Sequence, residues 1–270
     1  MARLDQELVS RGLARSRTHA AKLISDGKVS SGGAVLSKAS LHVDAHAQLE
    51  VAAHPEDVYV SRAGHKLAGA LAAFPAVAVA GRRCLDAGAS TGGFTDVLLR
   101  QGAAEVVAVD VGHGQLVQPL REDPRVDVHE GLNVRYLTPD LIGGVAALTV
   151  ADLSFISLTL VVEPLAACTE PGGDLVLMVK PQFEVGKERL SRTGVVSSDH
   201  ERRRAVARVA GAAVDAGLGL RGLAASPLPG QDGNIEYFLW MKRRMSVPVP
   251  KIEGRDEDVA ALMRTLWPND

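Results

Sequence analysis

The stretch LDAGASTGGF, residues 85–94, decides how the rest of the chain is interpreted. An apolar run leads into it, and the helix-like pattern TDVLLRQG follows. Gly88 and Gly92 frame a G-x-S-x-G pattern, in which Ser90 would be the nucleophile of a serine hydrolase. The same glycines can instead let a nucleotide-like ligand lie against backbone N–H groups, or form a tight turn that binds nothing.

The order of the histidines disfavours the hydrolase. In that fold the catalytic residues follow the chain as Ser, then Asp or Glu, then His. The histidines after residue 90 are His113, His129 and His200, and all three precede the last predicted strands. Only one predicted strand of the sheet comes before Ser90, and no HGGG-type oxyanion segment precedes it. We therefore interpret the G-x-S-x-G pattern as a coincidence.

The glycine loop is better explained as a cofactor cradle. A strand, the loop, a helix and an acid at the end of the next strand, Asp110, occur in this order. A carboxylate at that place can accept hydrogen bonds from both hydroxyls of an adenosine ribose. Asp86 stands just before the loop and would repel a pyrophosphate, so the loop suits a cationic ligand. S-adenosylmethionine, which carries a sulfonium and an ammonium, is the cofactor that we predict.

From residue 82 onward, apolar runs alternate with helical patterns, which predicts an α/β fold. We expect a Rossmann-like, mostly parallel sheet of seven strands covered on both faces. The turn-rich connector SPLPGQDGN favours an antiparallel hairpin of the last two strands at one sheet edge. The predicted strands are 83–87, 105–110, 125–129, 147–152, 174–180, 219–225 and 235–242. The predicted helices are 63–74, 91–101, 115–121, 158–168 and 198–216.

The N-terminal part has a different pattern, with two short helices followed by short strands. Residues 1–40 hold seven basic residues against three acidic ones, although the whole chain has a formal net charge of −2. We expect a small α+β domain over residues 1–58 and a linker over 59–65. The catalytic domain would span 66–245, and a tail with one amphipathic helix would span 246–270.

Four ionisable residues stand at ends of predicted elements: Lys66, Asp152, Lys180 and Glu236. Ligands of doubly wound sheets bind at the carboxyl ends of the strands, where these residues can converge. Taken singly, each of these residues is more simply explained as an ordinary surface residue at the end of an apolar element. As a cluster, a lysine can stabilise the charge that develops on a ribose 2′-oxygen or accept its proton, while the carboxylates orient it. A methyl group could then move in line from sulfonium to oxygen without a metal.

Composition excludes several other classes of protein. The two cysteines, Cys84 and Cys168, lie in apolar contexts without a C-x-x-C partner, which favours buried thiols in a reducing cytosol. The most apolar stretch is about 15 residues with an internal proline, short of the roughly 20 that a membrane span needs. The N-terminus lacks the apolar run of a signal peptide. We expect a cytoplasmic monomer without a metal site or membrane contact.

The chain resembles the TlyA family of ribosomal RNA 2′-O-methyltransferases, whose catalytic domain is FtsJ-like. The segments that carry the resemblance are RLDQELVSRGLARSRTHAAKLISDGKV, YVSRAGHKL, CLDAGASTGGFTDVLL, VDVGHGQL, ADLSFISL, VKPQFEVGK and SPLPGQDGNIEYFLW. The first of them is similar to an S-four type RNA-binding module. After GKV, however, the chain reads SSGGAVL where the module often has a Val-Asn-Gly turn, so no RNA contact is carried over to that turn.

The resemblance implies methyl transfer from S-adenosylmethionine to cytidine 2′-oxygens of small- and large-subunit rRNA, linked to antibiotic susceptibility. It places a catalytic tetrad on Lys66, Asp152, Lys180 and Glu236. The expected cofactor-binding residues are Asp86, Gly88, Ser90, Thr91, Gly92, Gly93, Phe94, Asp110, Val111, Asn133 and Asp152. The expected RNA-binding residues are Arg3, Arg11, Arg15, Arg17, Lys22, Lys28 and Arg62. Two rival functions are a haemolysin, after a name used in this family, and a non-catalytic ribosome-assembly factor.

Overall fold

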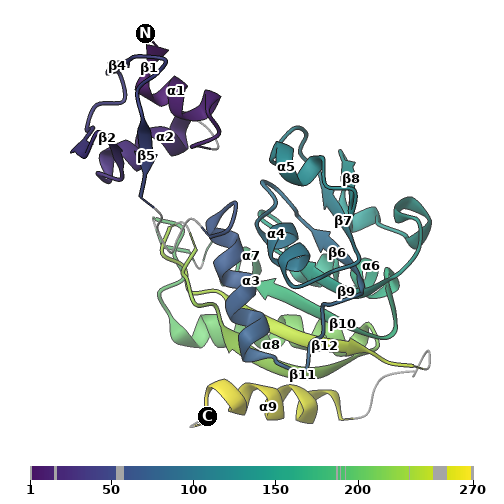
Figure 1. The fold of residues 1–270 in the computed structure, drawn as a ribbon. Coiled ribbons are helices and arrows are strands. Elements are labelled where there is room, and N and C mark those ends of the chain that lie inside the picture. Colours follow the sequence, from purple (N-terminus) through teal and green to yellow (C-terminus); the bar gives the residue numbers. More distant parts are fainter. Residues whose placement is uncertain are drawn as a thin grey trace. The chain divides into compact units, whose positions relative to one another are not determined.

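The computed structural model describes residues 2–14, 17–52, 58–186, 188, 190–191, 193–230, 232–245 and 254–268. The chain divides into two compact units, Met1–Val58 and Tyr59–Asp270. In the smaller unit, two helices pack on short strands through a core that includes Leu4, Leu8 and Ile24 (Figure 1). Its elements are β1 (Ala2–Arg3), α1 (Leu4–Ser10), α2 (Arg17–Ser25), β2 (Val29–Ser31), β3 (Ala34–Val35), β4 (His42–Val43) and β5 (Leu49–Val51).

The described part of the larger unit contains a seven-stranded sheet in the order β11-β12-β10-β9-β6-β7-β8. All neighbouring strands are parallel except β12, which is antiparallel to both β10 and β11. The predicted mostly parallel sheet and the antiparallel hairpin at its edge are therefore confirmed. The strands are β6 (Arg83–Ala87), β7 (Glu105–Asp110), β8 (Val126–Glu130), β9 (Ala146–Ala151), β10 (Thr169–Val179), β11 (Leu218–Ala225) and β12 (Tyr237–Arg243).

Helices cover both faces of this sheet, because successive side chains of each strand point to opposite faces and both sets are apolar. One core joins the sheet to α3 (Arg62–Ala73), α4 (Gly93–Arg100) and α5 (Gln118–Arg121). The other core joins it to α6 (Val162–Ala167) and α8 (Asp199–Asp215). Short helices in the described part of the unit include η2 (Val134–Tyr136), η3 (Pro139–Ile142), η4 (Leu158–Leu160) and α7 (Pro181–Glu184).

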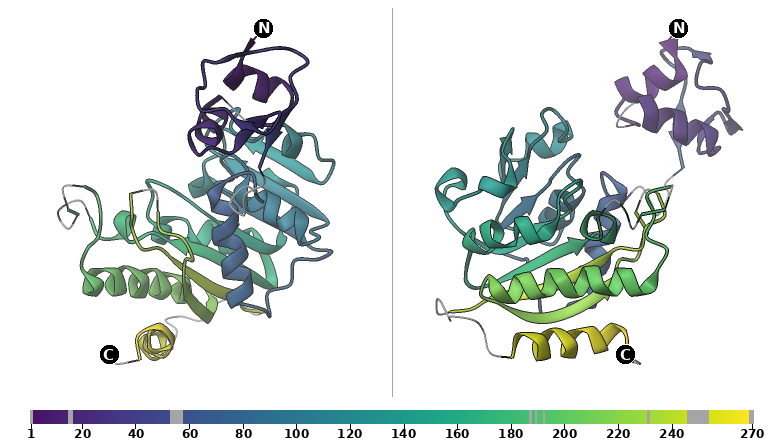
Figure 2. Two further views of the ribbon diagram at one scale, coloured as in Figure 1. Left: turned by 60° about the vertical axis from the view of Figure 1, so that its left-hand side comes forward. Right: turned by 180° about the vertical axis from the view of Figure 1, so that it is seen from behind.

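The C-terminal helix α9 (Arg255–Leu266) packs within the larger unit. It contacts β11 and α8, and Leu262 belongs to the same core as α8 (Figure 2). At its end, the Trp267 ring lies 5.3 Å from the Tyr237 ring, between centroids, and Arg203 stacks over Trp267 at 5.4 Å. The predicted amphipathic tail helix is thus present.

Some element bounds differ from the prediction for identifiable reasons. Helix α4 starts at Gly93, because Gly92 has a left-handed φ of +98° and cannot be a helical residue. Strand β10 begins at Thr169, which pairs with Ala146 before a shift of register, although the glycines of TEPGG read as a turn. The predicted helix 158–168 is a 3-10 turn, η4, followed by α6, with a break at Val161.

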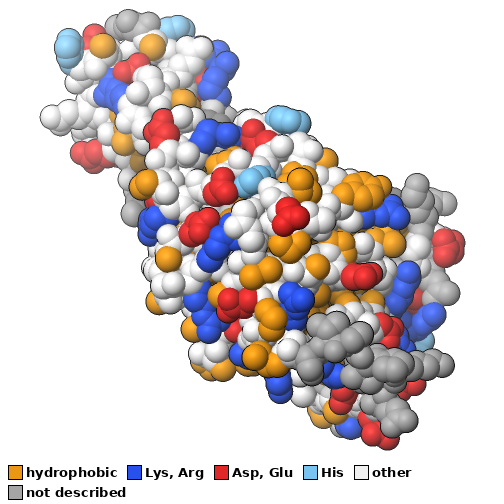
Figure 3. Space-filling view, turned by 90° about the vertical axis from the view of Figure 1, so that its right-hand side faces the viewer, with side chains coloured by type: hydrophobic (Ala, Val, Ile, Leu, Met, Phe, Trp, Pro, Cys, Tyr) orange, Lys and Arg blue, Asp and Glu red, His pale blue; other side chains and the backbone are white. Residues whose placement is uncertain are grey.

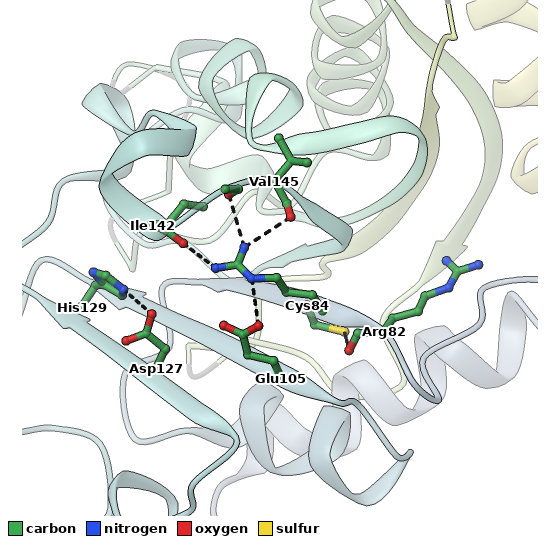
Figure 4. A network of polar contacts seen from close by, with 9 residues as sticks. Arg82, Cys84, Glu105, Asp127, His129, Ile142 and Val145 are labelled. Atoms are coloured by element: carbon green, nitrogen blue, oxygen red, sulfur yellow. Dashed lines mark hydrogen bonds and ion pairs between the residues drawn. The ribbon is translucent and has the colours of Figure 1, made fainter.

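Arg83 fixes the amino-terminal edge of the sheet, opposite the edge where ligands bind in such folds. Its guanidinium lies 3.0 Å from Glu105 Oε2 and donates to the carbonyls of Ile142 and Val145 (Figure 4). These contacts join the amino ends of β6, β7 and β9, so the charges at this edge have a structural role.

The surface in view in Figure 3 mixes acidic, basic and apolar side chains over the same face. Within the described ranges, no helix has both the length and the apolar character needed to cross a membrane. The same part of the chain gathers no group of three or more His, Cys, Asp or Glu side chains that could hold a metal ion.

Candidate functional site

The glycine loop follows β6 at the carboxyl edge of the sheet, and its glycines are sterically required. Gly88 has a φ of +88°, and a Cβ there would lie 2.9 Å from the carbonyl oxygen of Asp152. A Cβ on Gly92 would lie 2.3 Å from a methyl group of Leu120. The loop can therefore follow this path only with glycine at both positions.

Ser90 lies at the tip of the loop, also in the left-handed region, with a φ of +48°. Its hydroxyl lies 3.2 Å from Gln115 Oε1, to which it donates, rather than at a histidine. Its backbone N–H donates to Asp110 Oδ2 at 2.8 Å. The geometry gives Ser90 a role in loop structure, and its hydroxyl bonds to the amide oxygen of Gln115 rather than to a base that would activate it as a nucleophile.

A cavity of about 460 Å³ opens beside this loop, large enough for a nucleoside-sized ligand. Asp110 projects from the end of β7 and accepts from the N–H groups of Ser90 and Gly112, at 2.8 and 2.7 Å. Asn133 caps η2 by accepting from the N–H of Arg135 at 2.9 Å. The expected cofactor residues that line this cavity are Gly88, Ser90, Asp110, Val111, Asn133 and Asp152.

A second, smaller cavity of about 150 Å³ adjoins the first, with which it shares four lining residues. These are Gly88, Ser90, Asp152 and Ser154. Its other walls include Thr91, Gly93, Phe94, Lys180 and, from the start of α3, Ser61 and Ala63. The two cavities therefore form one composite site, in which Asp152 faces both parts.

Asp86 lies behind the loop and lines neither cavity. Its carboxyl is fully buried, and its Oδ2 accepts from the hydroxyl of Thr95 at 2.6 Å, while its Oδ1 has no hydrogen-bond partner. Burial raises the pKa of Asp86, the hydrogen bond from the Thr95 hydroxyl lowers it and the charge of Asp152 raises it, and together they move it from 3.8 to about 7. Asp86 therefore has no direct exposure to either cavity, and its carboxyl carries a perturbed pKa directly behind the loop.

Lys66 and Glu236 form a buried ion pair, although 170 residues separate them in the sequence. Lys66 Nζ lies 2.5 Å from Glu236 Oε2, and the two residues are 8% and 2% exposed. The other carboxylate oxygen of Glu236 accepts from Gln182 Nε2 at 3.4 Å. Both charges are compensated, which is the condition for burying them.

Lys180 and Asp152 form a second ion pair at the ends of β10 and β9. Lys180 Nζ lies 2.7 Å from Asp152 Oδ1, although the approach is not that of a directed hydrogen bond. The ammonium also donates to Ser154 Oγ at 3.0 Å. The four residues singled out in the sequence thus occur as two Lys–carboxylate pairs, one of which lines the composite site.

Close packing of α3 on α4 positions Lys66. A Cβ on Gly64 would lie 3.1 Å from the carbonyl oxygen of Gly93, and one on Gly93 would lie 2.3 Å from Ser61 Oγ. The glycines of SRAG and TGG therefore let the two helix starts approach each other. Lys66, one turn into α3, is brought in this way to Glu236, the residue that directly precedes β12.

Two phenylalanines lie next to the Lys180–Asp152 pair. Phe155 is 91% exposed, lines the larger cavity and has a left-handed φ of +64°. Its ring lies 5.3 Å from that of Phe183, between centroids, and Lys180 Nζ lies 5.9 Å from the Phe183 ring. A large aromatic side chain that stays in water beside a polar site is a candidate surface for a flat ligand group.

In the smaller unit, two of the expected RNA-binding arginines surround Asp5. Arg3 Nε and Arg17 Nη2 lie 3.0 and 3.2 Å from its carboxylate, whose pKa the hydrogen bond from Arg3 lowers to about 2. The Arg17 side chain remains 60% exposed. Arg11 donates to Glu7 and to the carbonyls of Ala45 and Ala47, so its donors serve the unit itself.

The other expected RNA-binding residues are Lys22, Lys28, Arg62 and Arg15. Lys22 and Arg62 are exposed, and Lys28 lies 3.8 Å from Asp26. Arg15 falls outside the described residues. In the described part of this unit, Arg17 and Lys22 therefore keep exposed side chains, whereas the donors of Arg11 are engaged within the unit.

Sequence reasoning missed three polar residues of the site: Ser154, Gln115 and Gln182. Ser154 accepts from Lys180 and lines both cavities, and Gln115 holds the hydroxyl of Ser90. Gln182 reaches Glu236. Ser154 and Gln182 each stand two residues after a residue that was singled out, which is the signal that could have identified them.

Comparisons with known proteins agree with this arrangement. A family model described as FtsJ-like methyltransferase matches residues 59–243, and an S4 domain model matches residues 2–49. The 16S/23S rRNA (cytidine-2′-O)-methyltransferase TlyA of Mycobacterium tuberculosis is 56% identical over 241 residues, which cover 89% of this chain and 90% of that protein. The "Putative rRNA methyltransferase YqxC" of Bacillus subtilis is 42% identical over 265 residues, 98% and 92% of the two chains.

A solved structure described as "Putative hemolysin from Streptococcus thermophilus" has the same fold. It superposes with a TM-score of 0.71 and 37% sequence identity, over 99% of this chain and 97% of that one. The match extends through both units and the C-terminal helix, so these parts occur together in more than one protein.

Proposed function

The chain belongs to the FtsJ-like methyltransferases, in the group of TlyA relatives that carry an S4 domain, and from this we propose that it methylates the 2′-oxygen of cytidine in ribosomal RNA. S-adenosylmethionine would be the methyl donor and rRNA the acceptor. The observation that supports the reaction best is the Lys180–Asp152 pair, because Asp152 lines both adjoining cavities and Lys180 lines the smaller one.

The larger cavity fits the cofactor. Its volume of about 460 Å³ suits a nucleoside-sized ligand, and Asp110 still has lone pairs for ribose hydroxyls beyond the two that accept from backbone N–H groups. The unpaired Oδ1 of Asp86 places a buried negative potential behind the loop, which favours a cation. When bound there, S-adenosylmethionine would supply an electrophilic methyl group on a positive sulfur.

Lys180 and Asp152 would act on the acceptor hydroxyl. An ammonium next to the 2′-oxygen stabilises the negative charge that develops as the oxygen attacks. The oxygen gains the methyl group and loses its proton, which the Lys180–Asp152 pair can take up. Lys66 of α3 and Glu236, which directly precedes β12, line neither cavity, and their buried pair would help to orient the acceptor ribose, since proximity and orientation lower the barrier.

RNA would be bound by both units of the protein. Phosphates would be bound by the exposed basic side chains of the smaller unit, Arg17 and Lys22 among them, which position the RNA but do not read its sequence. At the catalytic unit, the target nucleotide would leave its stack, and the exposed ring of Phe155 offers a surface against which a base can lie.

Methyl transfer from labelled S-adenosylmethionine to rRNA tests this proposal. Lys180→Ala should abolish transfer while calorimetry still detects cofactor binding, because the larger cavity keeps its walls. Lys242→Ala is the matched control, since Lys242 also pairs with a buried aspartate, Asp174, at 3.4 Å, at the other edge of the sheet. Normal turnover of Lys180→Ala would contradict the mechanism, and a protein that binds rRNA without any transfer would be an assembly factor.

A further inference from the structure

Glu184, the last residue of α7, is a buried carboxylate at the junction of two loops of the site. It is 4% exposed, and both of its oxygens are engaged. Oε2 accepts from the hydroxyl of Ser157 at 2.5 Å, and Oε1 accepts from the backbone N–H of Leu158 at 2.7 Å. Burial raises the pKa of Glu184, and these two hydrogen bonds oppose the rise.

The two donors end the segment that follows β9, residues 152–158. This segment contains Asp152 and Ser154, which line both cavities, and Phe155, whose left-handed φ of +64° is unusual for an aromatic residue. Such a backbone conformation costs on the order of 1–3 kcal/mol and persists only where its surroundings hold it. The hydrogen bonds to Glu184 fix the end of this segment. There, Ser157 also caps η4 by accepting from the N–H of Thr159.

Glu184 also belongs to the segment that carries Lys180. α7 begins directly after Lys180, and its Phe183 ring lies against Phe155. Arg208 of α8 donates to the carbonyl of Glu184 at 2.9 Å, so α7 is fixed to a long helix of the unit. Through Glu184, the loop that bears Asp152 is therefore tied to the segment that bears Lys180.

We propose that Glu184 is a positioning residue. It fixes the loop that bears Asp152 and Phe155 at a constant position relative to Lys180. It touches neither cavity and acts through Ser157 and Leu158. This inference rests on the proposed function, because the relative position of the two segments affects the reaction only if both act on one acceptor.

Kinetics of methyl transfer with three variants test the role. Glu184→Ala removes both acceptors and should lower kcat by about 10- to 100-fold, the loss that misplacement by about 1 Å can cause. Glu184→Gln should restore kcat to within about threefold, because its amide can accept from the Leu158 N–H and donate to the Ser157 hydroxyl. Asp174→Asn, which alters a fully buried carboxylate at the other edge of the sheet, should lower Tm without lowering kcat.

Hydrogen exchange separates positioning from a general effect on stability. A positioning role predicts that amides lose protection in one segment only, whereas general destabilisation would lower protection throughout the unit. In Glu184→Ala, amides of residues 153–159 should lose protection while the strands keep theirs. If Glu184→Ala does not fold, Ser157→Ala removes one of the two hydrogen bonds and should lower kcat by a smaller factor. Wild-type kcat in a folded Glu184→Ala or Ser157→Ala variant would overturn this inference alone. No transfer by the wild-type protein would instead refute the proposed function.

Discussion

Replacing Asp86 with asparagine should have opposite effects on stability at low and high pH. In the folded protein, burial raises the pKa of Asp86 to about 7, whereas the unfolded chain titrates near the ordinary value of 3.8. The raised pKa means that the folded state binds this proton more tightly, so the stability due to Asp86 is full below pH 4 and is lost as pH rises through 7. The difference of about three pH units corresponds to about 4 kcal/mol.

Asparagine removes this pH dependence but brings a smaller cost of its own. Its amide oxygen can still accept from Thr95, while its NH₂ replaces the unpaired Oδ1 and stays without an acceptor. An unpaired buried donor costs about 1–3 kcal/mol at every pH. Asp86→Asn should therefore be less stable than wild type by about 1–3 kcal/mol at pH 4 and more stable by a similar amount at pH 8.

Urea unfolding followed by tryptophan fluorescence measures this effect. Both tryptophans, Trp240 and Trp267, lie in the larger unit, which also contains Asp86. Thr95→Val is the companion variant. It removes the hydroxyl that lowers the pKa of Asp86, so it should destabilise the protein at pH 8 by about 2 kcal/mol. A free-energy difference between Asp86→Asn and wild type that stays constant from pH 4 to 8 would refute the reasoning.

Affinity of the wild-type protein for S-adenosylmethionine should rise roughly tenfold from pH 6 to 8, as Asp86 becomes charged, and Asp86→Asn should show no such rise in calorimetry. Asp110→Asn should weaken cofactor binding by about tenfold, because its NH₂ opposes the N–H of Ser90 or Gly112; equal affinities would remove Asp110 from the cofactor site. Trp267→Ala should cost about 2 kcal/mol of stability, measured by urea unfolding, and leave kcat unchanged; a large loss of kcat would show that α9 supports the site directly.

The sheet could be predicted because its signals are local. Each strand is a short apolar run, each loop has a glycine where the backbone turns, and the SPLPGQDGN connector marks the antiparallel hairpin. The end of a parallel strand is also a place that the sequence identifies, so Asp152 and Lys180 could be expected at one edge. Their catalytic roles stay a prediction.

Other features depend on packing, which the sequence does not reveal. Asp86 is an expected cofactor-binding residue, and the sequence does not reveal that its carboxyl is buried against Thr95 of α4 and lines neither cavity. Arg11 counts as a basic residue, yet its donors are used by Glu7 and nearby carbonyls. The contact of Glu184 with Ser157 spans 27 residues and two elements, so only the folded chain shows it.

Nucleoside analysis of rRNA treated with the purified protein and S-adenosylmethionine tests the central claim most directly. Digestion to nucleosides and mass spectrometry should show 2′-O-methylcytidine after incubation with wild type and none with Lys180→Ala. Methyl groups found on a base, or 2′-O-methylcytidine formed equally by Lys180→Ala, would contradict the account.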